Sequence, residues 1–208
     1  MKNFLLILSL TFLCFVLAGC SSDNTIINNS ANETTNYSNS NLVYETEQLS
    51  AEPKEVNIAS FSTNILDKDP NRQTNIDITC STLNGTLVKS GETFSFCDTV
   101  GKATTDRGYK EAKVFDADGN VELGLGGGNC QVSSTLYNAV LQDTNLEVIE
   151  RHPHSHIVYY VEKDKDAAVA YGSVDFKFKN NYESDIKIYA STTSEQVTVS
   201  IVKIVTSP

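Results

Sequence analysis

Residues 71–85 carry apolar side chains at helical spacing. Three of them fall at i, i+4 and i+7, the spacing of one helix face turned toward a core: Ile76, Cys80 and Leu83. Asn71 or Thr74 could cap the N-terminal end of this helix, and Gly85 stands where a glycine commonly closes one. The pattern predicts a helix over residues 71–85, in which Cys80 is a buried thiol.

A second helical pattern runs from Cys130 to Leu141. One stripe, which we expect to face the core, contains Val132, Leu136, Ala139 and Val140. A second row at helical spacing contains Cys130, Ser134, Tyr137 and Leu141. Three glycines, 126–128, come just before this segment and permit a sharp turn into a helix. Cys130 is therefore predicted at or just before the first turn of the second helix.

The remaining apolar segments have the composition and alternation of strands. They lie at 56–63, on both sides of Ser90-Gly91 within 86–96, at 112–123, and after the second helix at 146–152, 156–161, 169–179, 185–191 and 196–205. Asp118-Gly119 marks a hairpin turn within 112–123, and the last two segments read as a terminal hairpin. The predicted fold class is α+β, a single domain with a mainly antiparallel sheet and two principal helices.

The first 19 residues have the organisation of an export signal. Lys2 precedes an apolar run, 4–18, that is short for a membrane span. The run leads into Leu17-Ala18-Gly19-Cys20, which resembles the lipobox of bacterial lipoproteins. The resemblance implies a signal peptide over 1–19, cleavage before Cys20 and a lipid on its sulfur, which would attach the protein to the extracytoplasmic face of the cell membrane. An uncleaved apolar anchor is the alternative.

Residues 20–55 are rich in Asn, Ser and Thr and have few large apolar side chains. Such a segment cannot bury enough surface to offset its chain entropy, so we expect a disordered tether between the lipid and a domain over 56–208. The formal net charge of −10 argues against a nucleic-acid partner. No cofactor is expected.

Several separated blocks lie within about residues 61–180: in order they are LNGTLVKSGETFSF, VGKATTDRGYKEAKVF, GGGNCQVSSTLYNAVL, ERHPHSH and AVAYGSVDFKFKN. Together, and in this order, they resemble the VanW-like family. The resemblance implies an exported or membrane-attached protein of the Gram-positive cell envelope, but it implies no particular reaction. Cys97 departs from the family, where asparagine is commoner at this position, so it is a poor candidate for a shared role.

Cys130 is the main candidate for chemistry. At a helix N-terminus, unpaired N–H groups and the positive end of the helix dipole favour an anion such as a thiolate. The same N–H groups could stabilise an oxyanion, with Asn129 or Gln131 as an added amide donor. The glycines before it would let an extended substrate approach the sulfur. The predicted substrate-binding residues are Gly126, Gly127, Gly128, Asn129, Gln131, Ser134, Tyr137 and Arg107, the last as a partner for a carboxylate.

All three histidines of the chain fall within residues 151–156. If this segment is a strand, His152, His154 and His156 share one face, and one of them, with His154 named first, would be the base. A cysteine on a helix followed by a histidine on a strand is the order of papain-like and transglutaminase-like enzymes. Asp175, inside an apolar strand, is the more suggestive residue to orient the histidine, and Asp166 is the other candidate.

Two classes of function remain open. The first is a surface-anchored thiol amidase or acyltransferase acting on a cell-wall peptide. The second is a non-catalytic envelope module that binds peptidoglycan or a partner protein beside the glycine-rich turn. A zinc site built from the histidines and Cys130 is a third alternative, although no CxxC or HxxxH spacing supports it. The enzyme hypothesis requires the Cys130 sulfur and a histidine to meet in an open cleft.

Overall fold

A computed structural model describes residues 53–115 and 119–206, all of which belong to one compact unit. Within these residues, the first antiparallel sheet has the order β1 (Lys54–Asn64), β9 (Gln196–Val205), β8 (Ile186–Thr192) and β2 (Thr86–Val88). The second contains β3 (Thr93–Ser95), β7 (Lys177–Asn180) and β6 (Leu146–Glu150), and the third is the hairpin of β4 (Glu111–Phe115) and β5 (Val121–Leu125). The α+β class is confirmed.

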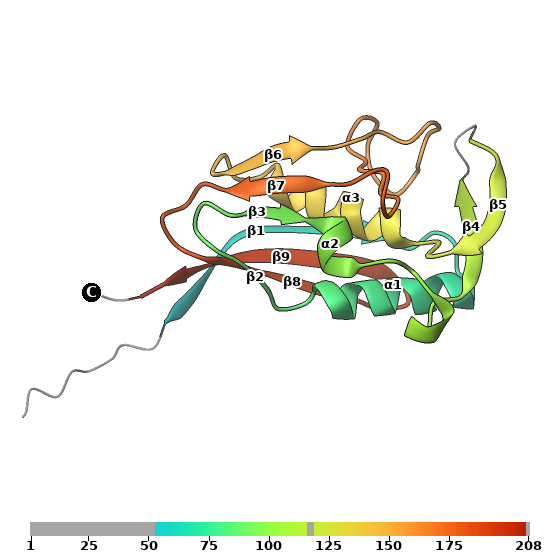
Figure 1. Ribbon diagram of the computed structural model, residues 1–208, viewed down its shortest axis with the longest axis horizontal. Helices are drawn as coiled ribbons and strands as arrows, with labels where there is room; N and C mark the ends of the chain where they lie inside the picture. The colour runs from blue at the N-terminus through green and yellow to red at the C-terminus, as the bar shows by residue number, and fades with distance from the viewer. Residues whose placement is uncertain (1–52, 116–118, 207–208) are drawn as a thin grey trace, which may run out of the picture. The chain divides into compact units, whose positions relative to one another are not determined.

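The first sheet is apolar on one face because its strands alternate. Ile186 and Ile188 on β8 and Val197, Val199 and Ile201 on β9 are fully buried. Two helices cover this face: α1 (Pro70–Leu83) contacts β8, and α3 (Asn129–Val140) contacts β1 and β9 (Figure 1). The alternation of the terminal hairpin therefore determines where both principal helices pack.

The start of α1 differs from the prediction. Asp69 is the N-cap, since its carboxylate accepts the Arg72 backbone N–H at 2.8 Å, and Pro70 follows at the first helical position. This pairing of an acidic cap with proline is a strong start signal, and it precedes both predicted caps, Asn71 and Thr74. Gly85, with φ +83°, lies just after the helix as predicted.

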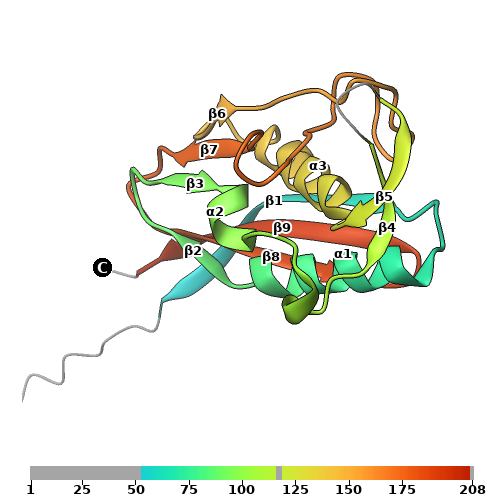
Figure 2. The same cartoon turned by 45° about the vertical axis from the view of Figure 1, so that its right-hand side comes forward.

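The helix α3 also contacts β6 of the second sheet, and in Figure 2 it lies between that sheet and β1 and β9. Its predicted apolar stripe is fully buried: Val132, Leu136, Ala139 and Val140. Ser133 and Thr135 are buried as well. Their hydroxyls tolerate burial because they donate to the carbonyls of Ala167 and Gln131, at 2.6 and 2.7 Å respectively. The first turn of α3 is thus held by contacts on several sides.

One predicted strand is absent and another is much shorter than predicted. Residues 156–161 are irregular, and of residues 169–179 only 177–179 belong to a strand, with an isolated bridge between Ala170 and Val174. Backbone groups of residues 169–176 bond to side chains of other segments: Val169 N–H donates to the Cys130 sulfur at 3.5 Å, and Asp175 N–H donates to Glu150 Oε1 at 3.3 Å. Apolar content alone cannot distinguish such a region from a strand.

Phe96 was also predicted in a strand, but it begins the short helix α2 (Phe96–Val100), which Ser95 caps by accepting the Asp98 N–H at 3.0 Å. A 3-10 turn, Thr105–Arg107, follows it. The hairpin of β4 and β5 is confirmed, although Asp118 lies outside the described residues.

The predicted signal peptide, Cys20 and the tether up to residue 52 also lie outside the described residues. The first strand begins at Lys54, two residues before the predicted start of the domain. Over residues 53–115 and 119–206, no helix has both the length and the apolar character needed to cross a bilayer.

Candidate functional site

Three glycines bring the start of α3 close to α1 and β4. A Cβ atom on Gly127 would lie 2.6 Å from the Lys113 carbonyl oxygen, and one on Gly128 would lie 2.7 Å from a side-chain carbon of Ile76. Gly128 also has φ +116°, which side chains with a Cβ rarely adopt. The sharp turn into the helix was predicted. The structure adds a second reason for glycine at 127 and 128, because a side chain there would collide with β4 or α1.

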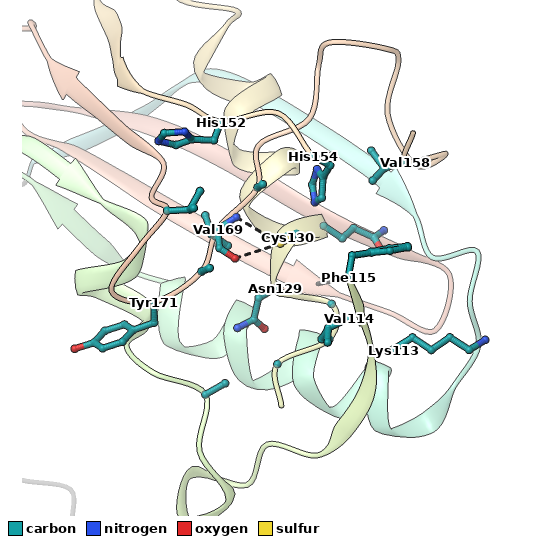
Figure 3. Close-up of a pocket in the computed structure, with 18 of the residues that line it drawn as sticks. Lys113, Val114, Phe115, Asn129, Cys130, His152, His154, Val158, Val169 and Tyr171 are labelled. Atoms are coloured by element: carbon teal, nitrogen blue, oxygen red, sulfur yellow. Dashed lines mark hydrogen bonds between the residues drawn. The ribbon is translucent and has the colours of Figure 1, made fainter. Parts of the chain in front are cut away.

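Cys130 is the second residue of α3. The N-cap is Gly128, which makes no side-chain capping hydrogen bond, so the first N–H groups of the helix are not satisfied by a cap side chain. The half-buried thiol donates to Val169 O at 3.4 Å and accepts Val169 N–H at 3.5 Å (Figure 3). Cys130 therefore stands where the helix favours negative charge, facing the loop that contains Val169.

His154 is held in one orientation by Asp166. Its Nδ1 lies 2.6 Å from Asp166 Oδ2, and its backbone N–H donates to the same oxygen at 2.6 Å. The His154 side chain is only 8% exposed. In Figure 3 its ring points from the loop toward the end of α3 that carries Cys130. Because Nδ1 is occupied by the carboxylate, Nε2 is the ring nitrogen left for a further partner.

Asp166 is in turn fixed by Arg151. Arg151 Nη2 donates to Asp166 Oδ1 at 2.7 Å, and Arg151 Nε donates to the Asp166 carbonyl at 2.6 Å. The guanidinium lies over the ring of Tyr137, 5.5 Å from its centroid. Arg151 thus holds both the carboxylate and the backbone carbonyl of Asp166, so Tyr137, Arg151 and Asp166 together support His154.

The charge balance of this group favours a protonated His154. Burial lowers the pKa of His154, but hydrogen bonding and charge interaction with Cys130 and Asp166 outweigh it and raise the pKa above its ordinary value. Burial would raise the pKa of Asp166, yet the hydrogen bonds from His154 hold it below its usual value. Cys130, His154 and Asp166 therefore form one electrostatically linked set.

Cys130 and His154 line a cavity of about 960 Å³. Its lining includes the helix start from Gly126 to Gln131, Cys130 among them, and loop residues from His152 to Tyr160. Exposed apolar side chains contribute as well, and they include Leu66, Phe115, Val121, Ile157, Tyr159 and Tyr171. The cavity is large enough for a peptide-sized ligand and brings Cys130 and His154 to one surface.

The other two histidines lie differently because residues 151–156 are a loop. His152 is half exposed, points away from Cys130 in Figure 3, and has Nε2 3.0 Å from Glu150. The His156 ring stacks on Phe115, and its buried Nε2 has no hydrogen-bond partner. Burial and the nearby His154 lower the pKa of His156. Among the three, His154 is the histidine whose pKa is raised by hydrogen bonding and charge interaction with Cys130.

Asp175, the favoured orienting residue, lies in a different network. Its carboxylate accepts the Ser95 hydroxyl at 2.6 Å, the Cys97 N–H at 2.9 Å and the Phe176 N–H at 2.8 Å. These contacts direct it to the N-terminus of α2. The carboxylate that contacts His154 is that of Asp166, so the preference for Asp175 was wrong in geometry: Asp175 precedes β7, which begins at Lys177, and does not lie inside a strand.

The predicted substrate-binding residues divide into two groups. Those that line the cavity are Gly126, Gly127, Gly128, Asn129 and Gln131. Ser134, Tyr137 and Arg107 are not part of its lining. Ser134 is buried and donates to Cys130 O at 2.7 Å, Tyr137 packs edge-on against Phe176, and Arg107 donates to the carbonyls of Val100 and Lys102. Their contacts are structural.

Cys97 and Cys80 are free, as is Cys130. Burial, followed by the negative charge of Asp175, raises the pKa of Cys97 to about 12, and burial raises that of Cys80 to about 12. Both are therefore protonated at neutral pH. Within the described residues, no three metal-ligating side chains come together, so the zinc alternative finds no support there.

Sequence reasoning missed three residues of this region. Arg151 lies in the segment ERHPHSH, but nothing in that segment indicates a contact with Asp166. Arg72 and Tyr160 also line the cavity, and Tyr160 had been placed in a strand. Burial raises the pKa of Tyr160, as does the charge of Cys130, and Ser134 and Arg72 oppose this. Long-range contacts of this kind leave no local signal in a single sequence.

Comparisons with known proteins place these residues in context. A family model described as "VanW like protein" matches residues 71–202, well over half of the chain. "Uncharacterized protein YoaR" of Bacillus subtilis (strain 168) is 38% identical over 133 residues, which cover 64% of this chain and 43% of that protein. "Vancomycin B-type resistance protein VanW" of Enterococcus faecalis (strain ATCC 700802 / V583) is 33% identical over 133 residues, with coverages of 61% and 47%. The chain thus spans less than half the length of either relative, and no solved structure matches it.

Proposed function

This chain belongs to the VanW-like protein family, and from the geometry of its cavity we propose that it is a cysteine-dependent amidase or acyltransferase. The observation that carries the proposal is the fixed His154 ring, with Nδ1 2.6 Å from Asp166 and the opposite edge free to serve Cys130. This is the arrangement by which a carboxylate sets the tautomer of a catalytic histidine. Cys130 is the nucleophile, His154 the general base and acid, and Asp166 the orienting residue.

The proposed reaction proceeds through a thioester. The Cys130 sulfur, with its proton on His154, attacks a carbonyl carbon, and the carbon–oxygen π electrons move to the oxygen. The Cys130 N–H is the proposed donor to that oxyanion, because the N–H groups of Asn129 and Gln131 already donate to the carbonyls of Gly126 and Gly128 at 3.0 Å. When the tetrahedral intermediate collapses, the carbon–nitrogen bond breaks and His154 gives its proton to the leaving amine. Water or an acceptor amine then attacks the thioester, releases the acyl group and restores the thiol.

We propose a cell-wall peptide as the acyl donor, because the lipobox and the tether would hold the domain beside the wall. The relative in Enterococcus faecalis is named for vancomycin resistance, which is consistent with an envelope role. The proposal covers this domain only, since the chain spans less than half of that protein. The leader sequence and the cavity support the proposal from independent parts of the chain.

An activated ester tests the nucleophile without knowledge of the substrate. Incubation with p-nitrophenyl acetate is expected to leave an acetyl group on Cys130, detected by mass spectrometry of its peptide, and to release p-nitrophenol in a burst. Cys130→Ser should lower the burst rate by about 100-fold or more. Cys97→Ser, which changes another cavity-lining thiol, is the matched control and should acylate normally. Acetylation of Cys97 with none on Cys130 would contradict the assignment of the nucleophile.

A non-catalytic binding module is the second candidate. It is favoured by one observation: the Cys130 thiol donates to and accepts from the backbone of Val169, contacts that a purely structural cysteine would also make. In that case the cavity would bind a peptide without forming a covalent intermediate. The same ester experiment separates the two, because a structural thiol would give no burst and no acetylated Cys130.

We propose that the protein is anchored by lipid at Cys20 on the outer face of the cytoplasmic membrane. Several acyl chains bind a bilayer durably, whereas one binds only marginally. Replacing Cys20 with alanine should therefore move the protein from the membrane fraction into soluble fractions, measured by immunoblotting after cell fractionation. The matched control is Cys14→Ala within the leader, which should leave the distribution unchanged. Persistent membrane association of the Cys20 variant would favour an uncleaved apolar anchor.

A further inference from the structure

The cavity beside Cys130 contains a cation whose charge is not balanced by a described carboxylate. Arg72, in the first turn of α1, lines the cavity, and its Nη2 donates to Gln131 Oε1 at 2.9 Å. Its Nε is buried and has no hydrogen-bond partner. Among the described residues, no Asp or Glu forms a salt bridge with it. Arg72 itself is partly exposed to the cavity, and a buried donor without a partner is costly unless another group completes it.

Gln131 keeps Arg72 in this position. The Gln131 Nε2 donates to Thr63 Oγ1 at 3.1 Å and to Asn64 O at 3.0 Å, so its Oε1 is fixed where Arg72 reaches it. The Gln131 side chain is 1% exposed. Because Gln131 directly follows Cys130 in α3, the guanidinium is tied to the same helix turn as the thiol. Arg72 and Cys130 also share a neighbour, since the charge of Arg72 lowers the pKa of Tyr160 and that of Cys130 raises it.

The charge on the cavity lining differs in sign from that of the chain. The described lining includes three cations, Arg72, Lys102 and Lys113, and one carboxylate, Asp67, which lies 3.8 Å from Lys113. The chain as a whole has a formal net charge of −10. A second buried polar atom without a partner, His156 Nε2, belongs to a residue of the same lining. A local positive field of this kind attracts an anionic ligand.

We propose that Arg72 binds a carboxylate of the ligand, so that the substrate class is a peptide with a free carboxylate close to the amide that Cys130 attacks. The guanidinium fork matches a carboxylate in two-point geometry, which a lysine cannot reproduce. The apolar side chains of Phe115, Val121 and Ile157 would contact the rest of the peptide. This inference rests on the proposed role of Cys130 and adds the charge of its substrate.

Two alkylating reagents test the inference directly. Iodoacetate has a carboxylate next to its reacting carbon, whereas iodoacetamide is neutral, and both transfer a two-carbon group to the sulfur with loss of iodide. The ratio of their rates at Cys130, measured by peptide mass spectrometry on the full chain, reports whether a carboxylate is bound beside the thiol. Arg72→Gln should lower the iodoacetate-to-iodoacetamide ratio on the order of fivefold. Arg72→Lys keeps the charge and should give an intermediate ratio.

The controls separate local binding from general charge. Lys89→Gln makes the same change in net charge outside the cavity lining and should leave the ratio within about 1.5-fold of wild type. Thermal unfolding of each variant shows whether it is folded, and the lysine variant provides the test if the glutamine variant is not. An unchanged ratio in folded Arg72 variants would overturn the carboxylate assignment while leaving the role of Cys130 intact. If Cys130 reacted with neither reagent, the proposed function would fail, and this inference with it.

Discussion

Replacing Asp166 with alanine is expected to lower the free energy of unfolding by about 3–5 kcal/mol, because it leaves Arg151 enclosed without its partner. The Asp166 side chain is 10% exposed, and its two carboxylate oxygens accept Arg151 Nη2 at 2.7 Å and both the backbone N–H and the ring of His154 at 2.6 Å. Alanine has no carboxylate, so all of these hydrogen bonds are lost at once. Urea unfolding at pH 7 measures the loss.

Acid should remove the same stabilisation from the wild-type protein. The pKa of Asp166 is lowered in the folded state, so its contribution is complete above the unfolded value, near 3.9, and is lost as the pH falls through the folded value. The difference in stability between wild type and Asp166→Ala should therefore shrink on acidification below about pH 4. Asp98→Ala, which alters an exposed carboxylate, should cost below about 0.5 kcal/mol. A similarly small loss in Asp166→Ala would contradict the supporting role.

Much of the scaffold could be predicted from periodicity. The helix stripes and the terminal hairpin follow directly from the spacing of apolar residues, since one face of each of these elements is buried. The hairpin of β4 and β5, whose apolar side chains are largely exposed, was indicated by the turn signal Asp118-Gly119. The position of Cys130 at the start of α3 followed from the glycines before it and the stripe after it. These features are local, and the sequence contains their full signal.

The site itself could be predicted only in part. Cys130 and His154 were found because their residue types are rare and reactive, but Asp175 was preferred over Asp166 because it was expected inside a strand, and β7 begins only at Lys177. In the loop structure of 151–176, Arg151 reaches across 15 positions to Asp166, and Arg72 lies 59 positions from its partner Gln131. Such pairings depend on tertiary packing, which the spacing of residues in one chain does not encode.

Replacing His154 with glutamine is expected to slow alkylation of Cys130 by about 100-fold at pH 7. The thiolate is the reactive form, and an imidazolium beside it stabilises that form. The raised pKa of His154 keeps the ring charged to higher pH than an ordinary histidine, so this stabilisation should persist at neutral pH. Glutamine can hydrogen-bond but cannot become positively charged. His152→Gln is the matched control, because His152 points away from Cys130 and should change the rate less than about twofold.

The central claim is that Cys130 and His154 act as one nucleophilic pair, and the alkylation rate against pH tests it most directly. Iodoacetamide labelling of each cysteine peptide can be followed by mass spectrometry from pH 5 to 10 in wild type, His154→Gln and His152→Gln. Cys97, whose pKa is raised to about 12, is the internal reference and should label little over this range. The account predicts rapid labelling of Cys130 at neutral pH that only His154→Gln suppresses. Labelling of Cys130 that rises only near pH 8.5, like a free thiol, and is unchanged in His154→Gln would contradict it.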